Sequence, residues 1–355
     1  MVTGLSAALL LAVVLAGHLA VRGERAPAPI PSAEHQDEAV AEQPTPDECA
    51  AGMRLSGTFL QPQLAADWSV ADWMAEFNDL RQACITEVVV QWTADSRART
   101  AVYPTNLAGY TRSTQHDVVA NALTAAESAG IKVYLGLQTN DDWWQTYSAD
   151  PGWLAGEAAI AQAVLDELAQ RYGHHQALAG WYVPFEVDNW HHTSRANWDA
   201  LSAFYTAVSN RTRTATPELP LIIAPFFNPA GGLTPESWTE MWTVILSGVH
   251  IDVIALQDGV GAGNTTTDQL ATWFGATREA IDRAGARTQL WADTETFTPD
   301  FQPMPVRQVV ANMAAVNGYV SRFWSFSYNH YQSPRQVGPI HHRAYLGYLA
   351  SGDVD

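Results

Sequence analysis

Residues 178–184 have the sequence LAGWYVP and lead directly into Phe185 and Glu186. The run is apolar at nearly every position, which is typical of a strand covered on both faces in a parallel sheet. Similar runs recur along the chain: RLSGTFL from Arg54, EVVVQW from Glu87, KVYLGLQ from Lys132, LIIAPF from Leu221, VIALQ from Val253, QLWAD from Gln289 and VSRFWSF from Val320. Together these stretches predict eight buried parallel strands.

Amphipathic helical stretches separate the strands. Ser69 to Asp72 resembles a capping box at a helix start, and Gly130 ends the next helix. Further helices are expected at 154–172, 195–210, 235–246, 267–284 and 305–317, with Pro235 and Pro305 in first turns. This alternation over residues 48–355 favours an α/β fold, a single (β/α)8 TIM barrel. The first strand continues as GTFLQPQ, which lacks the glycine fingerprint of a dinucleotide-binding fold.

The N-terminal residues indicate export. Residues 5–20 are apolar, too short to span a bilayer comfortably but suited to a signal peptide. Residues 1–24 are therefore predicted to be a signal peptide or an uncleaved anchor. Residues 25–47 are rich in Pro, Ala and Glu and are predicted to be a disordered tether. The protein is expected to be secreted or tethered to the outer side of the cytoplasmic membrane, with membrane contact only through that anchor.

Charge and composition exclude several functions. The chain carries 19 basic and 37 acidic residues, a formal net charge of −18, and this acidity argues against a nucleic-acid partner. Lys132 is the only lysine, and it begins a predicted strand, at the wrong end of a barrel for chemistry. Schiff-base catalysis and pyridoxal phosphate are therefore disfavoured. No cofactor is predicted.

The two cysteines, Cys49 and Cys84, each precede a predicted strand by a few residues. If the two strands are neighbours, both sulfur atoms lie at the bottom of the barrel. A disulfide is then expected in an oxidising compartment, and two unpaired buried thiols are the alternative.

Carboxylates gather where predicted strands end, which is where barrel enzymes place reactive groups. Glu186 follows the fourth strand and Glu295 ends the seventh. Since these strands lie on opposite sides of the ring, we expect the two carboxyls to face each other across the mouth as a catalytic pair. Asp293 competes with Glu295 for that role. Asp258 can bind a substrate hydroxyl, tune a catalytic carboxyl or simply shape a turn.

Aromatic and amide side chains accompany the carboxylates at the strand ends. Sugars pack their C–H faces on aromatic rings and need hydrogen-bonding groups at their hydroxyls. The predicted substrate-binding residues are Trp92, Gln138, Trp143, Trp144, Trp181, Asp188, Trp190, Asn228, Gln257, Asp258, Trp291, Asp293, Tyr328, His330 and Tyr331. Of these, Trp92 and Trp181, like Trp324, suit either the mouth or the core.

Other chemistries find little support. The histidine pairs at 174–175, 191–192 and 341–342 are adjacent in sequence, so their side chains diverge in regular structure. The chain has neither HExxH nor GxSxG, which disfavours a metallohydrolase and a serine hydrolase. No metal site is predicted.

Four motifs carry a family resemblance. GWYVPFEVD, IALQDGVG, WADTETF and SFSYNHYQSP occur in order between about Gly57 and Tyr348. They resemble a bacterial domain-of-unknown-function family, number 4434, that is grouped with TIM-barrel glycoside hydrolases. The resemblance implies roles for Glu186, Asp258 and Glu295. Retaining barrel glycosidases place Asn before the fourth-strand acid, where this chain has Phe185, so retaining or inverting stereochemistry stays open.

The sequence thus predicts an exported glycoside hydrolase that cleaves a polysaccharide or oligosaccharide. Glu186 is the expected general acid and Glu295 the nucleophile or base. One alternative is a non-catalytic carbohydrate-binding barrel of an envelope polysaccharide system. Another is a lyase or transglycosidase on the same scaffold.

Overall fold

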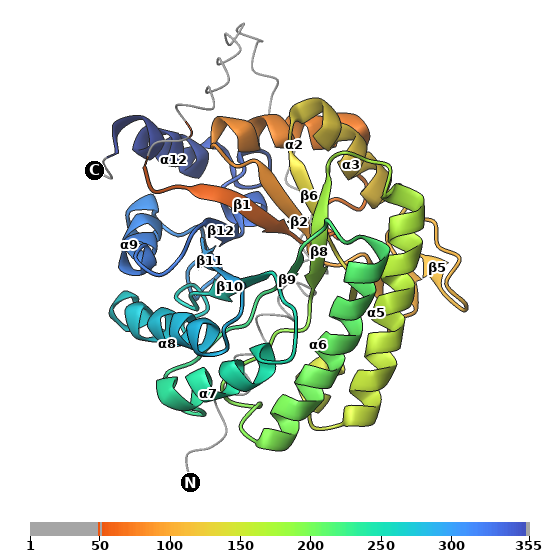
Figure 1. Ribbon diagram of the computed structural model, residues 1–355. Helices are drawn as coiled ribbons and strands as arrows, with labels where there is room; N and C mark the ends of the chain where they lie inside the picture. Colours follow the sequence, from red (N-terminus) through yellow and green to blue (C-terminus); the bar gives the residue numbers. More distant parts are fainter. Residues whose placement is uncertain (1–48, 50–51, 353–355) are drawn as a thin grey trace, which may run out of the picture. The chain divides into compact units, whose positions relative to one another are not determined.

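The barrel is a closed ring of parallel strands. The structure, a computed structural model, describes residue 49 and residues 52–352, so the predicted leader and tether lie outside the described residues. Around the ring the order is β1-β12-β11-β10-β9-β8-β6-β2 (Figure 1). The strands are β1 (Leu55–Leu60), β2 (Glu87–Val90), β6 (Lys132–Gly136), β8 (Leu178–Val183), β9 (Leu221–Ile223), β10 (Val253–Gln257), β11 (Gln289–Glu295) and β12 (Phe323–Phe326). The predicted (β/α)8 fold is confirmed.

Helices surround the ring on its outer side (Figure 1). The long ones are α2 (Val70–Gln82), α3 (Val118–Ala129), α5 (Pro151–Tyr172), α6 (Arg195–Ala215), α7 (Pro235–Leu246), α8 (Leu270–Arg283), α9 (Val306–Val316) and α12 (Pro339–Ser351). Ser69 caps α2 with the expected capping box, and Gly130 ends α3 in the left-handed conformation. None of the described helices is both long and apolar enough to span a membrane.

Some boundaries and elements differ from expectation. The predicted helix at 267–284 divides into a 3-10 turn, η1 (Thr267–Gln269), and α8, while Pro305 caps α9 instead of opening it. A small sheet of β5 (Thr111–Arg112), β4 (Thr100–Ala101), β3 (Ala94–Asp95) and β7 (Gln138–Thr139) was not predicted. Two-residue strands carry too little hydrophobic pattern to be recognised. The short helices α4 (Trp143–Thr146), α10 (Tyr328–Tyr331) and α11 (Pro334–Val337) were also missed.

Large aromatic side chains fill the barrel interior. Phe59, Tyr134, Tyr182, Trp291 and Trp324 pack together there with smaller aliphatic residues. A second and larger apolar cluster lies between the strands and the helices. The interior is therefore a packed core, as in other barrels of this size, and any active site must lie above it at one end of the strands.

The N-terminal end of the barrel is closed by a polar network. Glu87 accepts hydrogen bonds from Arg322 at 2.5 Å, from the Trp324 indole at 2.9 Å and from the Tyr134 hydroxyl at 3.3 Å. Arg322 also lies over the Trp291 ring, 5.0 Å from its centroid. These contacts give the buried Glu87 carboxylate three donors at the N-terminal end of the barrel, so its role there is structural.

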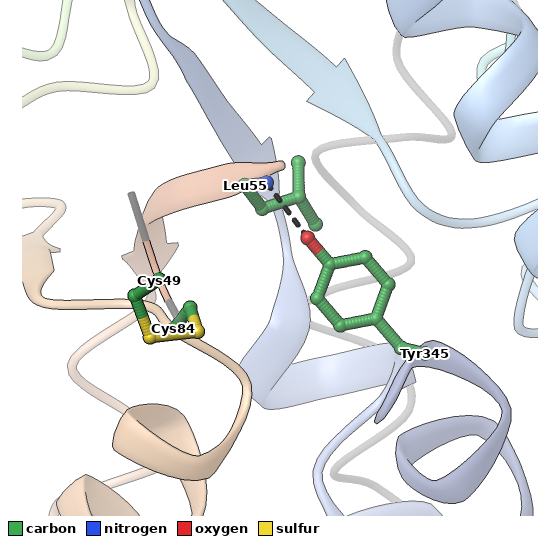
Figure 2. The surroundings of a disulfide bond; sticks show 4 residues. All are labelled: Cys49, Leu55, Cys84 and Tyr345. Atoms are coloured by element: carbon green, nitrogen blue, oxygen red, sulfur yellow. Dashed lines mark hydrogen bonds between the residues drawn. A yellow bond between two sulfur atoms is a disulfide. The ribbon is translucent and has the colours of Figure 1, made fainter. Parts of the chain in front are cut away.

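Cys49 and Cys84 form a disulfide next to β1 (Figure 2). The strand begins beside it, and the backbone N–H of Leu55 donates to the Tyr345 hydroxyl at 2.7 Å (Figure 2). β1 and β2 are neighbours in the ring, so both cysteines precede adjacent strands. The disulfide thus ties the start of the barrel chain to the segment before β2.

Removing this disulfide is expected to destabilise the barrel measurably. The cysteines are 35 residues apart, and closing a loop of that length stabilises the fold by about 4 kcal/mol in the chain-entropy model. A Cys49→Ser, Cys84→Ser double variant should therefore unfold at lower denaturant concentration than the oxidised wild type. Reduction should bring the wild type to the same midpoint and leave the variant unchanged. A double variant as stable as the oxidised wild type would refute this prediction.

Candidate active site

Four carboxyl groups gather at the C-terminal ends of β8, β10 and β11. Along β11, Trp291 lies in the barrel interior, and the alternation of a strand places Asp293 and then Glu295 on the same inward side above it. Asp258 follows β10, and its backbone N–H donates to the Asp293 carbonyl at 3.0 Å. Glu186 comes three residues after the last residue of β8. This group of carboxyls therefore stands on the floor and wall of the barrel mouth.

The sequence analysis placed Glu186 and Glu295 on opposite sides of the ring, and this expectation was wrong: β8, which precedes Glu186, and β11, which carries Glu295, are three steps apart. Only β9 and β10 stand between β8 and β11 on one side of the ring. The two carboxyls act on each other electrostatically, and Asp293 interacts with both. The structure thus brings the predicted pair into one charged group together with Asp258 and Asp293.

Burial governs the protonation of this group. Asp258, Asp293 and Glu295 are only 1%, 2% and 4% exposed, whereas Glu186 is partly exposed. Burial raises the pKa of Glu186 and of Glu295 to about 7, because a desolvated carboxylate is unfavourable. Burial together with the negative charge of Glu295 holds the pKa of Asp258 and Asp293 well above the usual range. The mouth therefore retains protons at neutral pH.

The loop after β10 surrounds Glu295. The backbone N–H of Ala262 donates to Glu295 Oε2 at 2.7 Å, and the N–H of Gly261 also acts on this carboxyl. Both interactions favour the ionised form and oppose the effect of burial on the pKa. Glu295 is therefore the member of the pair that is best equipped to carry negative charge.

Glu186 has a different environment. Its carboxyl interacts with the Gln257 side chain, whose Nε2 also donates to the Ala224 carbonyl at 2.8 Å. The Trp143 indole N–H donates to the backbone carbonyl of Glu186 at 3.1 Å, and the Trp143 ring stacks on Phe185 with 5.1 Å between centroids. These contacts fix the segment that carries Glu186. The Gln257 side chain is the hydrogen-bonding group that acts on the Glu186 carboxyl, whereas backbone N–H groups act on Glu295, so the two carboxyls stand in different environments.

Three of the tryptophans predicted to bind sugar lie in the core instead. Trp143, Trp181 and Trp291 are 2%, 0% and 4% exposed. Trp181 faces the helices and donates to Thr216 at 2.8 Å, while Trp291 lies in the barrel interior. A position at a strand end does not show in which direction a ring points. These three rings point into the core because burying a large apolar surface is favourable. Trp92, Trp144 and Trp190 are partly exposed and stay candidates for sugar platforms.

Several predicted polar contacts are engaged in holding loops. Gln138 donates to the Glu157 carboxylate at 3.1 Å, and the buried Tyr328 hydroxyl shares a hydrogen bond with His342. Asp188 is 1% exposed and accepts from the backbone N–H groups of Trp190 and His191. These three residues were predicted to bind substrate, and the structure assigns them structural contacts because buried polar groups must be satisfied.

Asn228 joins the loops that follow β8 and β10. Its Nδ2 donates to Asn264 Oδ1 at 3.1 Å, and its Oδ1 accepts from the Ala230 N–H. Its backbone carbonyl accepts from the side chains of Asn189 and Trp190, each at 3.1 Å. Each polar atom of its side chain thus makes one contact that positions the loops, and because the side chain is partly exposed, Asn228 stays a candidate for substrate binding.

The residues after β12 complete the rim. His330 shares a 2.6 Å hydrogen bond with Ser327, and burial lowers its pKa to about 4, so it is neutral at physiological pH. Tyr331 is partly exposed and close enough to Glu295 for that charge to help raise its pKa to about 12. Both residues border the mouth as hydrogen-bonding groups, and His330 is a poor general base there.

The prediction omitted two residues that line or support the mouth, Gln91 and Tyr147. Gln91 is buried with its Oε1 unpartnered, and it interacts with Tyr182 below Glu186. Tyr147 stacks on His191 with ring centroids 3.8 Å apart. Gln91 lies near the end of the predicted strand EVVVQW and directly follows the observed β2, so its position at a strand end was a usable signal. The contact between Tyr147 and His191 joins two loops, and the sequence of neither loop indicates it.

No group of three or more His, Cys, Asp or Glu side chains in the described residues is arranged to hold a metal ion. The four carboxyls, together with the partly exposed rings of Trp92, Trp144 and Trp190, define a barrel mouth built from carboxyls and aromatic rings. The chain belongs to the family described as a domain of unknown function, DUF4434, which matches residues 55–338. Curated protein sequences give no match.

Solved structures with the same fold include glycoside hydrolases. A "putative alpha-L-fucosidase" from Bacteroides thetaiotaomicron has a TM-score of 0.70 and 22% identity, with 83% of this chain and 96% of that chain covered. An endo-β-1,4-mannanase from Thermotoga petrophila has a TM-score of 0.56 and 11% identity, covering 87% and 79% of the two chains. At these identities the similarity establishes the barrel fold and not the activity.

Proposed function

We propose that this protein is an exported glycoside hydrolase that cleaves an oligosaccharide or polysaccharide with Glu186 and Glu295. The observation that carries the proposal is the environment of the pair. Both carboxyls stand at the barrel mouth with a pKa raised to about 7, yet only Glu295 receives backbone N–H donors. Such a difference in environment is what an acid and a base in one site require.

The proposed reaction uses the two groups in turn. Glu186, protonated, gives its proton to the glycosidic oxygen as the bond to the anomeric carbon breaks. Glu295, ionised, either attacks the anomeric carbon to give a glycosyl-enzyme, which water then hydrolyses as Glu186 takes its proton, or takes a proton from a water molecule that itself attacks the anomeric carbon. The partly exposed rings of Trp92, Trp144 and Trp190 are proposed to pack against the sugar.

Export is part of the proposal. It is supported by the apolar segment at residues 5–20, and the Cys49–Cys84 disulfide suits an oxidising compartment.

The proposal is tested by incubating the purified protein with a panel of neutral oligosaccharides and polysaccharides and following reducing ends. Proton NMR of the first product shows whether the anomeric configuration is retained or inverted. Appearance of a reducing end that depends on Glu186 and Glu295 supports a hydrolase. Saturable glycan binding without any product would instead favour the carbohydrate-binding barrel, and unsaturated products would indicate a lyase.

Activity is expected to follow a bell-shaped pH profile centred near neutrality. Glu295 must be ionised, so activity rises as pH increases through its pKa, and Glu186 must be protonated, so activity falls above its pKa. Burial raises both pKa values to about 7, and two coupled carboxyls lose their protons in separate steps on either side of that value. The profile of kcat/KM measures this directly. A maximum near pH 4, as for solvated carboxyls, would contradict the proposed protonation.

A further inference from the structure

The loop between β10 and η1 is closed on itself by hydrogen bonds. Asp258 Oδ1 accepts from the Val260 N–H at 3.0 Å, and the Val260 carbonyl accepts from the Gly263 N–H at 3.1 Å. The Gly259 carbonyl accepts from the Asn264 N–H at 2.9 Å. We call residues 258–264 the β10 loop. Its backbone conformation is set by these internal bonds, independently of any substrate.

The β10 loop approaches Glu295 more closely than a side chain at its centre would permit. A Cβ atom added to Gly261 would lie 2.5 Å from the Phe297 carbonyl oxygen and 3.0 Å from Glu295 Oε2. Glycine at this position lets the backbone come close enough for the Ala262 N–H to donate to Oε2 at 2.7 Å. The close approach therefore directs backbone N–H groups of the β10 loop at the Glu295 carboxyl.

No cationic side chain of the described chain competes with these donors. The ionisable groups that act on Glu295 or are acted on by it are Glu186 after β8, Asp258 after β10, Asp293 in β11 and Tyr331 in α10. All of these are acidic or neutral. One oxygen each of Asp258 and Asp293 is buried without a hydrogen-bond partner, which costs less free energy for the neutral acid than for the carboxylate. The backbone N–H groups of the β10 loop are thus the anion-stabilising contacts of Glu295.

We propose that the β10 loop assigns the single negative charge of the site: the N–H groups of Gly261 and Ala262 hold Glu295 as the anion and thereby leave the proton on Glu186. Gly261 and Ala262 are positioning residues, acting through Glu295. The catalytic consequence rests on the proposed function, whereas the location of the charge is a property of the free protein and is measured without substrate.

The direct test is a carboxyl titration of the full chain labelled with ¹³C-glutamate. The signals are assigned by loss in Glu186→Gln and Glu295→Gln. Glu295 is expected to lose its proton at lower pH than Glu186 in the wild type. If Glu186 ionises first, the proposal is overturned, and this outcome is independent of whether any variant folds.

Ala262→Pro removes the N–H that donates to Glu295, while the control Ala262→Gly keeps it. Loss of a hydrogen bond to a charged group destabilises the ionised form. The midpoint of the Glu295 titration should therefore move up by about one pH unit or more. The control should titrate as the wild type does. An unshifted Glu295 in a folded Ala262→Pro protein would contradict the proposal.

Gly261→Ala provides a second perturbation, because its Cβ displaces the loop from Glu295. Like Ala262→Pro, this variant should titrate Glu295 at a higher pH than the wild type. It should also move the acidic limb of the activity profile to higher pH. A purely structural role would lower activity at every pH without moving that limb. Loss of activity in Glu186→Gln and Glu295→Gln together with unshifted titrations would retain the proposed function and reject this inference.

Discussion

Glu186→Gln and Glu295→Gln are each expected to lower kcat by about 10³-fold or more while leaving the fold intact. Gln has nearly the same shape as Glu but can neither donate the proton that the leaving oxygen needs nor attack the anomeric carbon. Far-ultraviolet circular dichroism and thermal unfolding check the fold, and initial rates on the best substrate of the panel measure the loss.

The leaving group separates the two roles. A sugar whose leaving group is a stable anion, such as dinitrophenolate, departs without protonation. Glu186→Gln should therefore recover much of its rate on such a substrate, whereas Glu295→Gln should not. Glu240→Gln, which changes an exposed carboxyl on α7, is the matched control and should have the activity of the wild type. Full activity in both site variants would remove the pair from the mechanism.

Trp143→Ala is expected to destabilise the protein by about 3–5 kcal/mol, the usual cost of deleting a buried large aromatic side chain. The ring stacks on Phe185, and its N–H donates to the Glu186 carbonyl. The variant should therefore also lose kcat through displacement of Glu186, and Trp143→Phe should show the kcat effect with a smaller loss of stability. Chemical denaturation and steady-state kinetics provide both numbers.

The adjacent tryptophan is the control for this prediction. Trp144 is partly exposed, so Trp144→Ala should cost much less stability than Trp143→Ala. If Trp144 is a sugar platform, its loss should raise KM with kcat nearly unchanged. If Trp143→Ala is instead stable and changes only KM, Trp143 binds sugar, as its position in the sequence suggested.

The barrel and the carboxyl pair were accessible from local patterns. Apolar runs such as LAGWYVP predict buried parallel strands wherever they occur, because strands covered on both faces need apolar residues on both sides. Once strands are assigned, their C-terminal ends follow, and Glu186, Asp258, Asp293 and Glu295 all lie there. The contacts between residues of separate loops could not be predicted from such patterns. Asn228 and Asp188 are polar residues after strands, and nothing in their neighbourhood distinguishes a loop contact from a substrate contact.

The aromatic residues show the same limit. Trp143 and Trp144 are adjacent in sequence, yet one is buried and the other partly exposed. Both belong to the four-residue helix α4, whose short length leaves no periodicity from which an inward face can be recognised. The direction of each ring depends on Phe185 and other residues from distant segments.

By itself the sequence determined the strand order along the chain, the ends at which chemistry is placed, and the identity of the candidate carboxyls. These depend on hydrophobic periodicity and connectivity, which are local properties. Only the tertiary structure decided that Asp258 and Asp293 join the two glutamates in one charged group, that Glu295 receives the Ala262 N–H, and that Trp181 and Trp291 are core residues. Charge state and burial depend on what surrounds a group in space, and those surroundings come from segments far apart in the chain.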